Sequence, residues 1–361
     1  MKLKSDPLIF FNRLKSAFIT GNFINGFNRL LLGIIPLIFI VVWFLFHDSL
    51  DSYYYTMMDP EYAYLFNGIT VIENHGRVDY YDHPGTPLEV LMAVTIQFIH
   101  IFRDEPLMDD VLKNPELYLK AMNVVLVALL IAILFFAGRF TFRRTGNLGL
   151  SLLVQATPLP FGIPHFMARV IPETLAILLV LILIILIMDY IVSIDKMPAN
   201  NKHAVLFSII IAVILATKIS MFPLFFIPLL LLKKTKKRLI YTGLTVILFL
   251  LVAYPVLLNF NSFFQWIKSL FMHSGHYGSG NTNILSVPDF TRNLKTLYES
   301  YRQVFYLLFM NLAIIAGGIL LKMRKKIPFP AEPYNAIIGL SVCYIFHPGL
   351  PRRQFSFQLR S

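Results

Sequence analysis

Residues 47–85 read HDSLDSYYYTMMDPEYAYLFNGITVIENHGRVDYYDHPG, and this polar stretch interrupts a chain that otherwise consists largely of apolar runs. The stretch contains seven acidic side chains but a single arginine, Arg77, and eight aromatic side chains are interleaved with them. Ionisable residues are costly in membrane proteins and therefore tend to mark functional regions. We expect the chemistry of this protein to be located in this segment.

The composition around this stretch is that of a helical membrane protein. The 361 residues are 57% hydrophobic and have a mean hydropathy of +0.66, whereas soluble domains are about 45–50% apolar. The net charge of +12 comes from basic residues that lie between apolar runs. These residues act as topology signals, and we expect no nucleic-acid partner. A single cysteine, Cys343, excludes an internal disulfide framework and a cysteine-based zinc site.

The apolar runs predict an all-α, polytopic fold with about eight or nine transmembrane helices, since a span needs about 20 residues and about 17 is the lower end. The runs are 30–46, 122–137, 148–164, 171–191, 204–216, 221–232, 239–258 and 305–321, with a partial run at 334–346. No small-residue cleavage site follows the first run, so it indicates a signal anchor and not a cleaved signal peptide.

Five basic clusters lie between these runs, and the positive-inside rule places all five in the cytoplasm. An even number of spans must then separate each cluster from the next. This parity excludes the run 88–102 as a span, because counting it would move Arg139, Arg143 and Arg144 outside. As a helix the run is about 22 Å long, too short for about 30 Å of hydrocarbon. We therefore predict an interfacial helix here, in a multi-pass protein of the plasma (inner) membrane with a cytoplasmic N-terminus.

The outer face then carries two large segments and the short hairpin tip 217–220. The first segment contains two interfacial helices, and the second of these begins with Thr86-Pro87-Leu88-Glu89, the pattern of a capping box. We divide the chain into a cytoplasmic segment 1–29, a transmembrane catalytic module 30–258 with the first outer loop 47–120, an outer loop 259–304, C-terminal spans 305–346 and a tail 347–361. The tail is too irregular to cross a membrane, and we expect a truncated end.

Asp59-Pro60-Glu61 opens an amphipathic run that ends near Gly76, as a capped helix does. One interpretation makes Asp59 an N-cap and Glu61 a first-turn acid that the helix dipole favours. The other makes Asp59 a general base that is held at the membrane surface. The two interpretations are compatible, because a cap fixes the direction of a carboxylate.

A second polar turn, 80–87, contains Asp82 and His83 between aromatic residues and two prolines. Proline and glycine make such a turn rigid. It is either a loop with a solvated Asp-His pair or a turn that aims Asp82 or His83 at a ligand.

These two motifs, just after the first span and followed by a short interfacial helix, resemble the GT-C superfamily of membrane glycosyltransferases. The closest resemblance, over about 30–258, is to the branch of protein O-mannosyltransferases and lipid A aminoarabinose transferases. It implies that Asp59 deprotonates the acceptor hydroxyl with the assistance of Glu61. Asp82-His83-Pro84 stands where the family often has His-Pro-Pro, with Gly85 in place of the second proline. Pro60 separates two acids that are adjacent in the mannosyltransferases.

Three more polar elements fall on the predicted outer face. Arg169 and Glu173 open a span as the family's acid does, and Lys218 resembles the Thr-Lys element of the family. The resemblance implies that these residues bind the donor, with Lys218 and Arg169 at its phosphate. The structural alternatives are interface anchoring for the charged pair and snorkelling for Lys218.

The third element is a glycine-flanked loop with His273, His276 and Tyr277 in the second outer segment. It is either a flexible loop or a segment that closes over the donor. Its two histidines are candidate ligands for a divalent metal together with Glu61 or His83, although no spacing is diagnostic and we expect no other cofactor.

The resulting hypothesis is an inverting transfer of a sugar from a polyprenyl-phosphate donor to a glycan, lipid or protein acceptor outside the membrane. The alternatives are a lipid or glycan transporter or flippase, and a non-catalytic subunit of an envelope glycan assembly system. A transporter would carry its polar residues near the bilayer midplane, often in broken and repeated helices, whereas these spans are almost free of charge.

Overall fold

The computed structural model describes residues 30–47, 52–56, 61–73, 76–81, 83–158, 167–193, 201–272 and 287–300, with isolated positions between 302 and 317. Every regular element within these residues is a helix, which confirms the all-α fold class.

Within the part of the chain that the structure describes, three helices are long and apolar enough to cross a membrane: Leu30–His47, α6 (Pro115–Thr145) and α9 (Pro172–Ser193). They coincide with the predicted spans 30–46, 122–137 and 171–191. Helix α9 is apolar on all sides, and most of its side chains are buried inside the protein. A helix with no polar face needs neighbours or lipid all round, which explains why α9 lies at the centre of the bundle.

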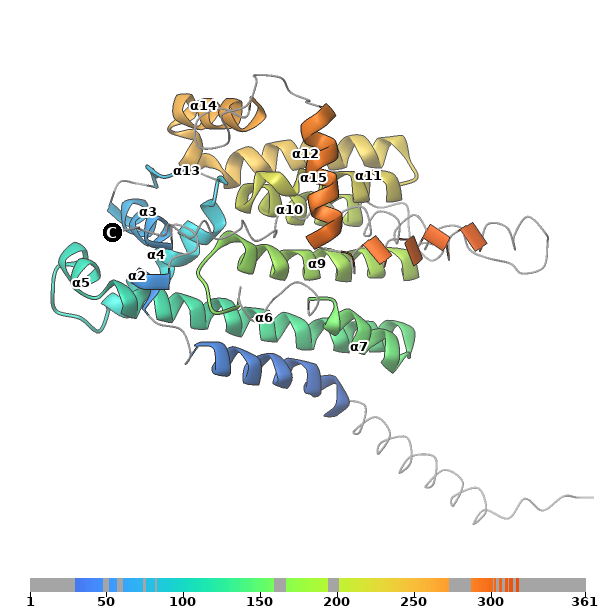
Figure 1. The fold of residues 1–361 in the computed structure, drawn as a ribbon, viewed down its shortest axis with the longest axis horizontal. Helices are drawn as coiled ribbons and strands as arrows, with labels where there is room; N and C mark the ends of the chain where they lie inside the picture. Colours follow the sequence, from blue (N-terminus) through green and yellow to red (C-terminus); the bar gives the residue numbers. More distant parts are fainter. Residues whose placement is uncertain are drawn as a thin grey trace, which may run out of the picture.

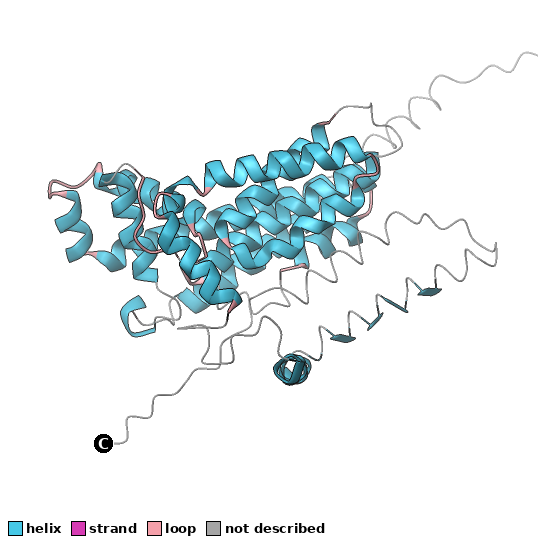
Figure 2. Cartoon of the chain, turned by 90° about the horizontal axis from the view of Figure 1, so that it is seen from above, coloured by secondary structure: helices cyan, strands magenta, loops and turns pink. Residues whose placement is uncertain are grey.

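The bundle is built on α9, which packs against α6 on one side and against α10 (Lys202–Thr217) on the other. Helix α10 in turn packs against α12 (Thr235–Val252), and α7 (Leu148–Ala156) packs against α6. These helices lie roughly alongside one another (Figure 1), and Figure 2 shows the same elongated bundle from above.

The short helices of the first polar segment gather at one end of the bundle (Figure 1). They are α2 (Tyr53–Thr56), α3 (Glu61–Glu73), α4 (Thr86–His100) and α5 (Leu107–Lys113). Two helices from later in the chain join them, α13 (Tyr254–Leu257) and α14 (Phe260–Phe271); α15 (Val287–Ser300) follows in sequence. Phe263 and Trp266 of α14 pack with Val78 of the first segment and Ala216 of α10 in one apolar cluster. The two segments that were predicted to lie outside therefore meet at the same end; the side of the membrane stays a prediction.

Several predicted spans are shorter or interrupted among the described residues. The run 148–164 contains only α7, and the positions 159–166 lie outside the described residues. The run 221–232 forms a 3-10 helix, η3 (Ile219–Phe225), and then α11 (Phe226–Leu231). Pro223 and Pro228 explain this break, since proline lacks the N–H that a regular helix needs. The predicted hairpin tip is present, because α10 ends at Thr217 and Lys218 is extended.

The capping box predicted at Thr86 is wrong. Helix α4 begins at Thr86, but its N-cap is Gly85 in the left-handed conformation (φ 70°), without a side-chain capping bond. The carboxylate of Glu89 is buried and accepts a hydrogen bond from Asn67 of α3. Close packing of α3 on α4 explains the difference, because a Cβ at Gly68 would approach Met92 to 2.7 Å. The side chain of Glu89 therefore points into this interface.

Candidate functional site

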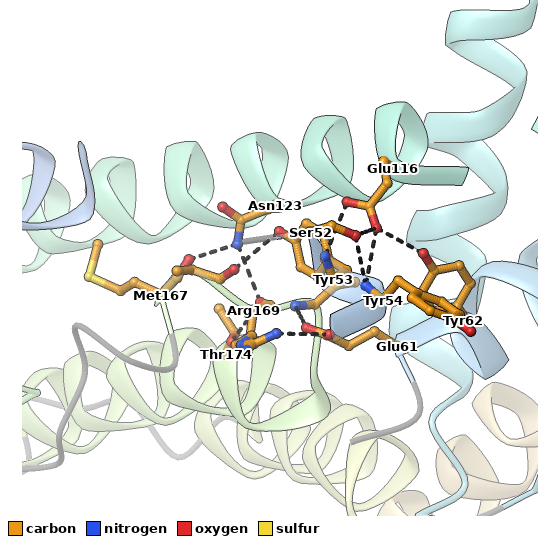
Figure 3. Close-up of polar contacts among 12 residues, drawn as sticks. Ser52, Tyr53, Tyr54, Glu61, Tyr62, Glu116, Asn123, Met167, Arg169 and Thr174 are labelled. Atoms are coloured by element: carbon orange, nitrogen blue, oxygen red, sulfur yellow. Dashed lines mark hydrogen bonds and ion pairs between the residues drawn. The ribbon is translucent and has the colours of Figure 1, made fainter. Parts of the chain in front are cut away.

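A buried ion pair joins the first polar segment to the start of α9. Nη1 of Arg169 lies 3.2 Å from Oε2 of Glu61, and Oε1 of the same carboxylate accepts from the backbone N–H of Val170 at 3.1 Å. Arg169 is 2% exposed and Glu61 is fully buried. Figure 3 shows the two side chains meeting between α3 and the segment that leads into α9. The first residue of α3 is therefore fixed to a position more than 100 residues later in the chain.

Tyr53 of α2 packs against the arginine of this ion pair. The guanidinium carbon of Arg169 lies 5.9 Å from the centre of the tyrosine ring, in a cation–π geometry. The tyrosine hydroxyl donates to the carbonyl of Ala168 at 3.1 Å. Burial and the nearby Glu61 carboxylate raise the pKa of Tyr53 well above its usual range. Tyr53 therefore serves as a neutral hydrogen-bond donor at this position.

A second buried ion pair lies beside the first. Nζ of Lys218, at the tip between α10 and η3, contacts Oε1 of Glu173 in the first turn of α9. Oε2 of Glu173 and Oγ of Ser220 are buried without a hydrogen-bond partner among the described residues. Both atoms therefore have hydrogen-bonding capacity that the described residues do not use.

His83 approaches this second pair from the turn before α4. It interacts electrostatically with Glu173, and its ring meets the Trp266 ring edge-on at 6.2 Å. The backbone of His83 is left-handed, with a φ of 67°. Among the predicted site residues, Lys218 and His83 thus both interact with Glu173. Arg169, four residues before Glu173, pairs with Glu61.

The remaining predicted site residues lie outside the described part of the chain: Asp59, Asp82, His273, His276 and Tyr277. Their proposed roles stay predictions. The described residues contain no group of three or more His, Cys, Asp or Glu side chains that could hold a metal ion. A metal site that used His273 or His276 would involve residues beyond those described.

Glu116 is a polar centre that sequence reasoning missed. Its carboxylate accepts hydrogen bonds from the hydroxyls of Ser52 and Tyr62, each at 2.8 Å, and from the backbone N–H groups of Tyr53 and Tyr54, each at 3.2 Å. Figure 3 shows these donors converging on the start of α6. The crowding of tyrosines around residues 53–62 was the available signal, because their hydroxyls need an acceptor when they are buried.

Asp110 is a second acid that sequence reasoning missed. Arg103 holds it with two nitrogens, and Tyr118 and Asn114 also donate to it. The arginine hydrogen bonds, aided by those of Tyr118 and Asn114, keep the pKa of Asp110 far below its usual range in spite of its burial. This network ties α5 to α6 and gives the acid a structural role.

The comparisons with known proteins agree with one part of the chain. Residues 190–346, less than half of the chain, match the model of glycosyltransferase family 87. No curated protein and no solved structure matches the chain. The family match supports a glycosyltransferase, and its region begins within α9 and includes Lys218 but not the first polar segment.

Proposed function

We propose that this protein is an inverting membrane glycosyltransferase that uses a polyprenyl-phosphate sugar on the outer face of the plasma membrane. The observation that carries the proposal is that two buried ion pairs use Arg169 and Glu173, which lie four residues apart where α9 begins. Lys218, from the region that matches a glycosyltransferase family, pairs with Glu173. Arg169, which precedes Glu173 by four residues, pairs with Glu61 from the first polar segment. Two parts of the chain with independent indications of sugar transfer are thus tied to the same short segment, 169–173, and this supports the proposal.

In the proposed reaction the acceptor hydroxyl attacks the anomeric carbon and loses its proton to Asp59, which precedes Glu61 by two residues. The bond between the anomeric carbon and the phosphate oxygen breaks, and polyprenyl phosphate leaves. A single displacement of this kind inverts the anomeric configuration. The leaving phosphate gains negative charge and needs a cation more than a proton donor.

Lys218 is better suited than Arg169 to meet that phosphate. Arg169 is 2% exposed and is held between Glu61 and the Tyr53 ring. Lys218 sits at a hairpin tip, and its partner Glu173 keeps one oxygen without a protein partner. A phosphate would compete with Glu173 for Lys218, and His83 lies beside the carboxylate that would be displaced. We assign Arg169 and Glu61 to anchoring and Lys218 to the donor.

The experiment uses the full chain purified in detergent with radiolabelled polyprenyl-phosphate mannose, glucose, arabinose or aminoarabinose, and a membrane extract that supplies acceptors. We expect release of polyprenyl phosphate from one of these donors and a loss of about 100-fold or more in Asp59→Asn, the lower end for removal of a general base. Asp79→Asn is the matched control, because Asp79 is an exposed acid of the same segment. Full activity in Asp59→Asn would remove this residue from the mechanism, and no consumption of any donor would reject the proposed function.

A further inference from the structure

Asn67 of α3 uses its whole side-chain amide to hold the turn that precedes α4. Nδ2 donates to the carbonyl of Tyr80 and to Oε1 of Glu89, each at 2.6 Å. Oδ1 accepts from the backbone N–H groups of Asp79 and Tyr80, at 3.3 and 3.1 Å. A side-chain amide has two donor hydrogens and two acceptor lone pairs, and Asn67 is buried. Three of its four bonds go to the turn, so the amide acts as a backbone-like partner for residues 79 and 80.

Glu89 supports both Asn67 and the far end of the same turn. Oε1 of Glu89 is the acceptor for Asn67, and a Cβ at Gly85 would lie 3.2 Å from this oxygen. Tyr64 of α3 packs at the same place, with its ring carbon 3.2 Å from that Cβ position. Glu89 is fully buried and forms no ion pair within the described residues. The carboxyl thus sits under the turn with α3 on one side and Gly85 on the other.

Burial raises the pKa of Glu89 to about 8, and the hydrogen bond from Asn67 opposes this rise only in part. At neutral pH the carboxyl is therefore mostly protonated. A neutral carboxyl can stay buried without a cationic partner, whereas a carboxylate at the same place would bear the full cost of desolvation. Deprotonation would favour local opening of the α3–α4 interface beneath the turn.

The opposite side of the turn is held by the second outer segment. Nδ2 of Asn259 donates to the carbonyl of Val78 at 2.6 Å, and Nη2 of Arg77 donates to Oδ1 of Asn259 at 2.8 Å. Trp266 of α14 meets the His83 ring edge-on. The described residues of this turn are thereby held by Asn67 of α3 at positions 79 and 80, and by Asn259 and Trp266 at positions 78 and 83. His83 lies in this turn and interacts electrostatically with Glu173.

We infer that Glu89, acting through Asn67, is a positioning residue that fixes the backbone of Asp79 and Tyr80 and so sets where His83 stands relative to Glu173. The inference rests on the proposed function, because it assigns the Glu173–Lys218 pair to the sugar-transfer site. Neither Glu89 nor Asn67 is assigned a contact with the donor or the acceptor. Their effect on transfer passes through the backbone of the turn.

The first test needs no substrate and reads the position of the turn directly. The chain has two tryptophans, so a Trp43→Phe background leaves Trp266 as the single reporter beside His83. In Asn67→Leu, which keeps the approximate size but none of the hydrogen bonds, we expect Trp266 emission to shift to longer wavelength with stronger acrylamide quenching. Glu105→Gln, a change in a half-exposed acid of the same outer segment, is the control and should leave the emission unchanged. An unchanged Trp266 signal in folded Asn67→Leu would overturn the inference.

The second test measures transfer as a function of pH. We expect kcat of the parent to fall as pH rises through about 8, with a smaller change in KM, and Glu89→Gln to abolish this alkaline fall. Asn67→Leu should lower kcat by about 100-fold, the loss that a displacement of about 1 Å in an active site can cause. The same alkaline fall in Glu89→Gln would overturn the inference even where Asn67→Leu does not fold. If no donor is consumed by the parent, the proposed function fails, and the fluorescence measurement still decides whether Asn67 holds the turn.

Discussion

Charged side chains meet at both ends of the helix bundle, and the arginines of the two ends differ most in exposure: the side chain of Arg169 is 3% exposed and that of Arg144 is 44% exposed. At one end the Glu61–Arg169 pair joins the first polar segment to the start of α9, with side chains 0% and 3% exposed. The Glu173–Lys218 pair beside it is also buried. In each pair a hydrogen bond joins residues far apart in the sequence: Arg169 donates to Glu61, and Lys218 donates to Glu173. These pairs determine how separate segments come together.

At the other end Asp189 of α9 contacts Arg144 and His203. Its Oδ1 lies 2.5 Å from Nη2 of Arg144 on α6, and its Oδ2 lies 3.1 Å from Nε2 of His203 on α10. The side chain of Arg144 is 44% exposed. Water and salt screen such a pair, so its net contribution is small. The same residue types thus form buried ion pairs at one end of the bundle and a partly exposed ion pair at the other.

Removal of Arg169 should have the largest effect. In Arg169→Met the carboxylate of Glu61 stays buried without its cation, and breaking one side of a buried ion pair costs about 3–5 kcal/mol. We expect a large drop in thermal stability of the detergent-purified chain, measured by intrinsic fluorescence or differential scanning fluorimetry. Transfer activity should be lost in parallel, since Glu61 starts the helix that follows Asp59.

The double variant Glu61→Gln/Arg169→Met is the matched control for this prediction. It removes both charges, and replacing a buried pair by neutral groups of similar volume is often close to neutral for stability. We expect the double variant to be more stable than Arg169→Met alone. If Arg169→Met is as stable as the wild type, the pair is not what joins the polar segment to α9.

Removal of Lys218 should cause the second largest loss of stability. It should also weaken use of the donor more directly than removal of Arg169 does. Lys218→Met leaves Glu173 unpaired, and we expect a destabilisation near the lower end of the range for buried pairs, about 3 kcal/mol. Transfer should fall by about 100-fold, as it does when a group that stabilises developing charge is removed. Glu173→Gln keeps the cation and should retain more activity than Lys218→Met. Equal losses in the two variants would assign both residues to structure and neither to the phosphate.

The sequence predicted the long helices better than it predicted the contacts between side chains. The uninterrupted apolar run of α9 gave a helix with the expected limits, because length and hydropathy alone determine a span. Arg169, Glu173 and Lys218 were predicted to lie on one face of the protein, and the structure shows Lys218 in contact with Glu173. Their partners were not predictable, since Glu61 and Arg169 are 108 positions apart and only packing brings them together.

Glu89 and Glu116 show why local patterns failed elsewhere. Thr86 to Glu89 has the spacing of a capping box, but packing of α3 on α4 turned the acid inward to Asn67. Glu116 follows a proline at a helix start and so resembles an ordinary first-turn acid. Its four donors come from residues 52–62, which no local rule connects to it. In both cases a tertiary contact overrode the local preference.

The third prediction concerns Glu89, a buried acid with no cation at the same end as the two ion pairs. Its pKa is about 8 in the folded protein and near 4.5 when it is exposed. Between these values the folded state retains a proton that the unfolded state has released, so stability should fall as pH rises from about 4.5 to about 8 and then level off. Melting temperatures measured at pH 5, 7 and 9 should show this fall in the wild type.

Glu89→Gln separates this group from all others that titrate in the same range. The amide keeps the acceptor for Asn67 and cannot ionise, so the variant should melt at least about 2 °C above the wild type at pH 9 and lack this component of the fall. Equal pH dependence in the two proteins would show that Glu89 is ionised in the folded state. The contrast between paired and unpaired acids at this end would then disappear.

The smallest effect is expected at the opposite end of the bundle. In Arg144→Ala the half-exposed guanidinium is lost, but His203 remains beside Asp189. Exposed ion pairs contribute about 0–1 kcal/mol, so the melting temperature should change little and transfer should be unaffected. If this end is cytoplasmic, as the positive-inside rule predicts, a cation there also acts during membrane insertion, where it favours retention on the inner side. Orientation, measured by accessibility of a single introduced cysteine in a Cys343→Ser background, should therefore respond more than stability does. A loss of stability as large as that of Arg169→Met would show that burial does not distinguish the two ends, because a screened pair would then contribute as much as a dehydrated one.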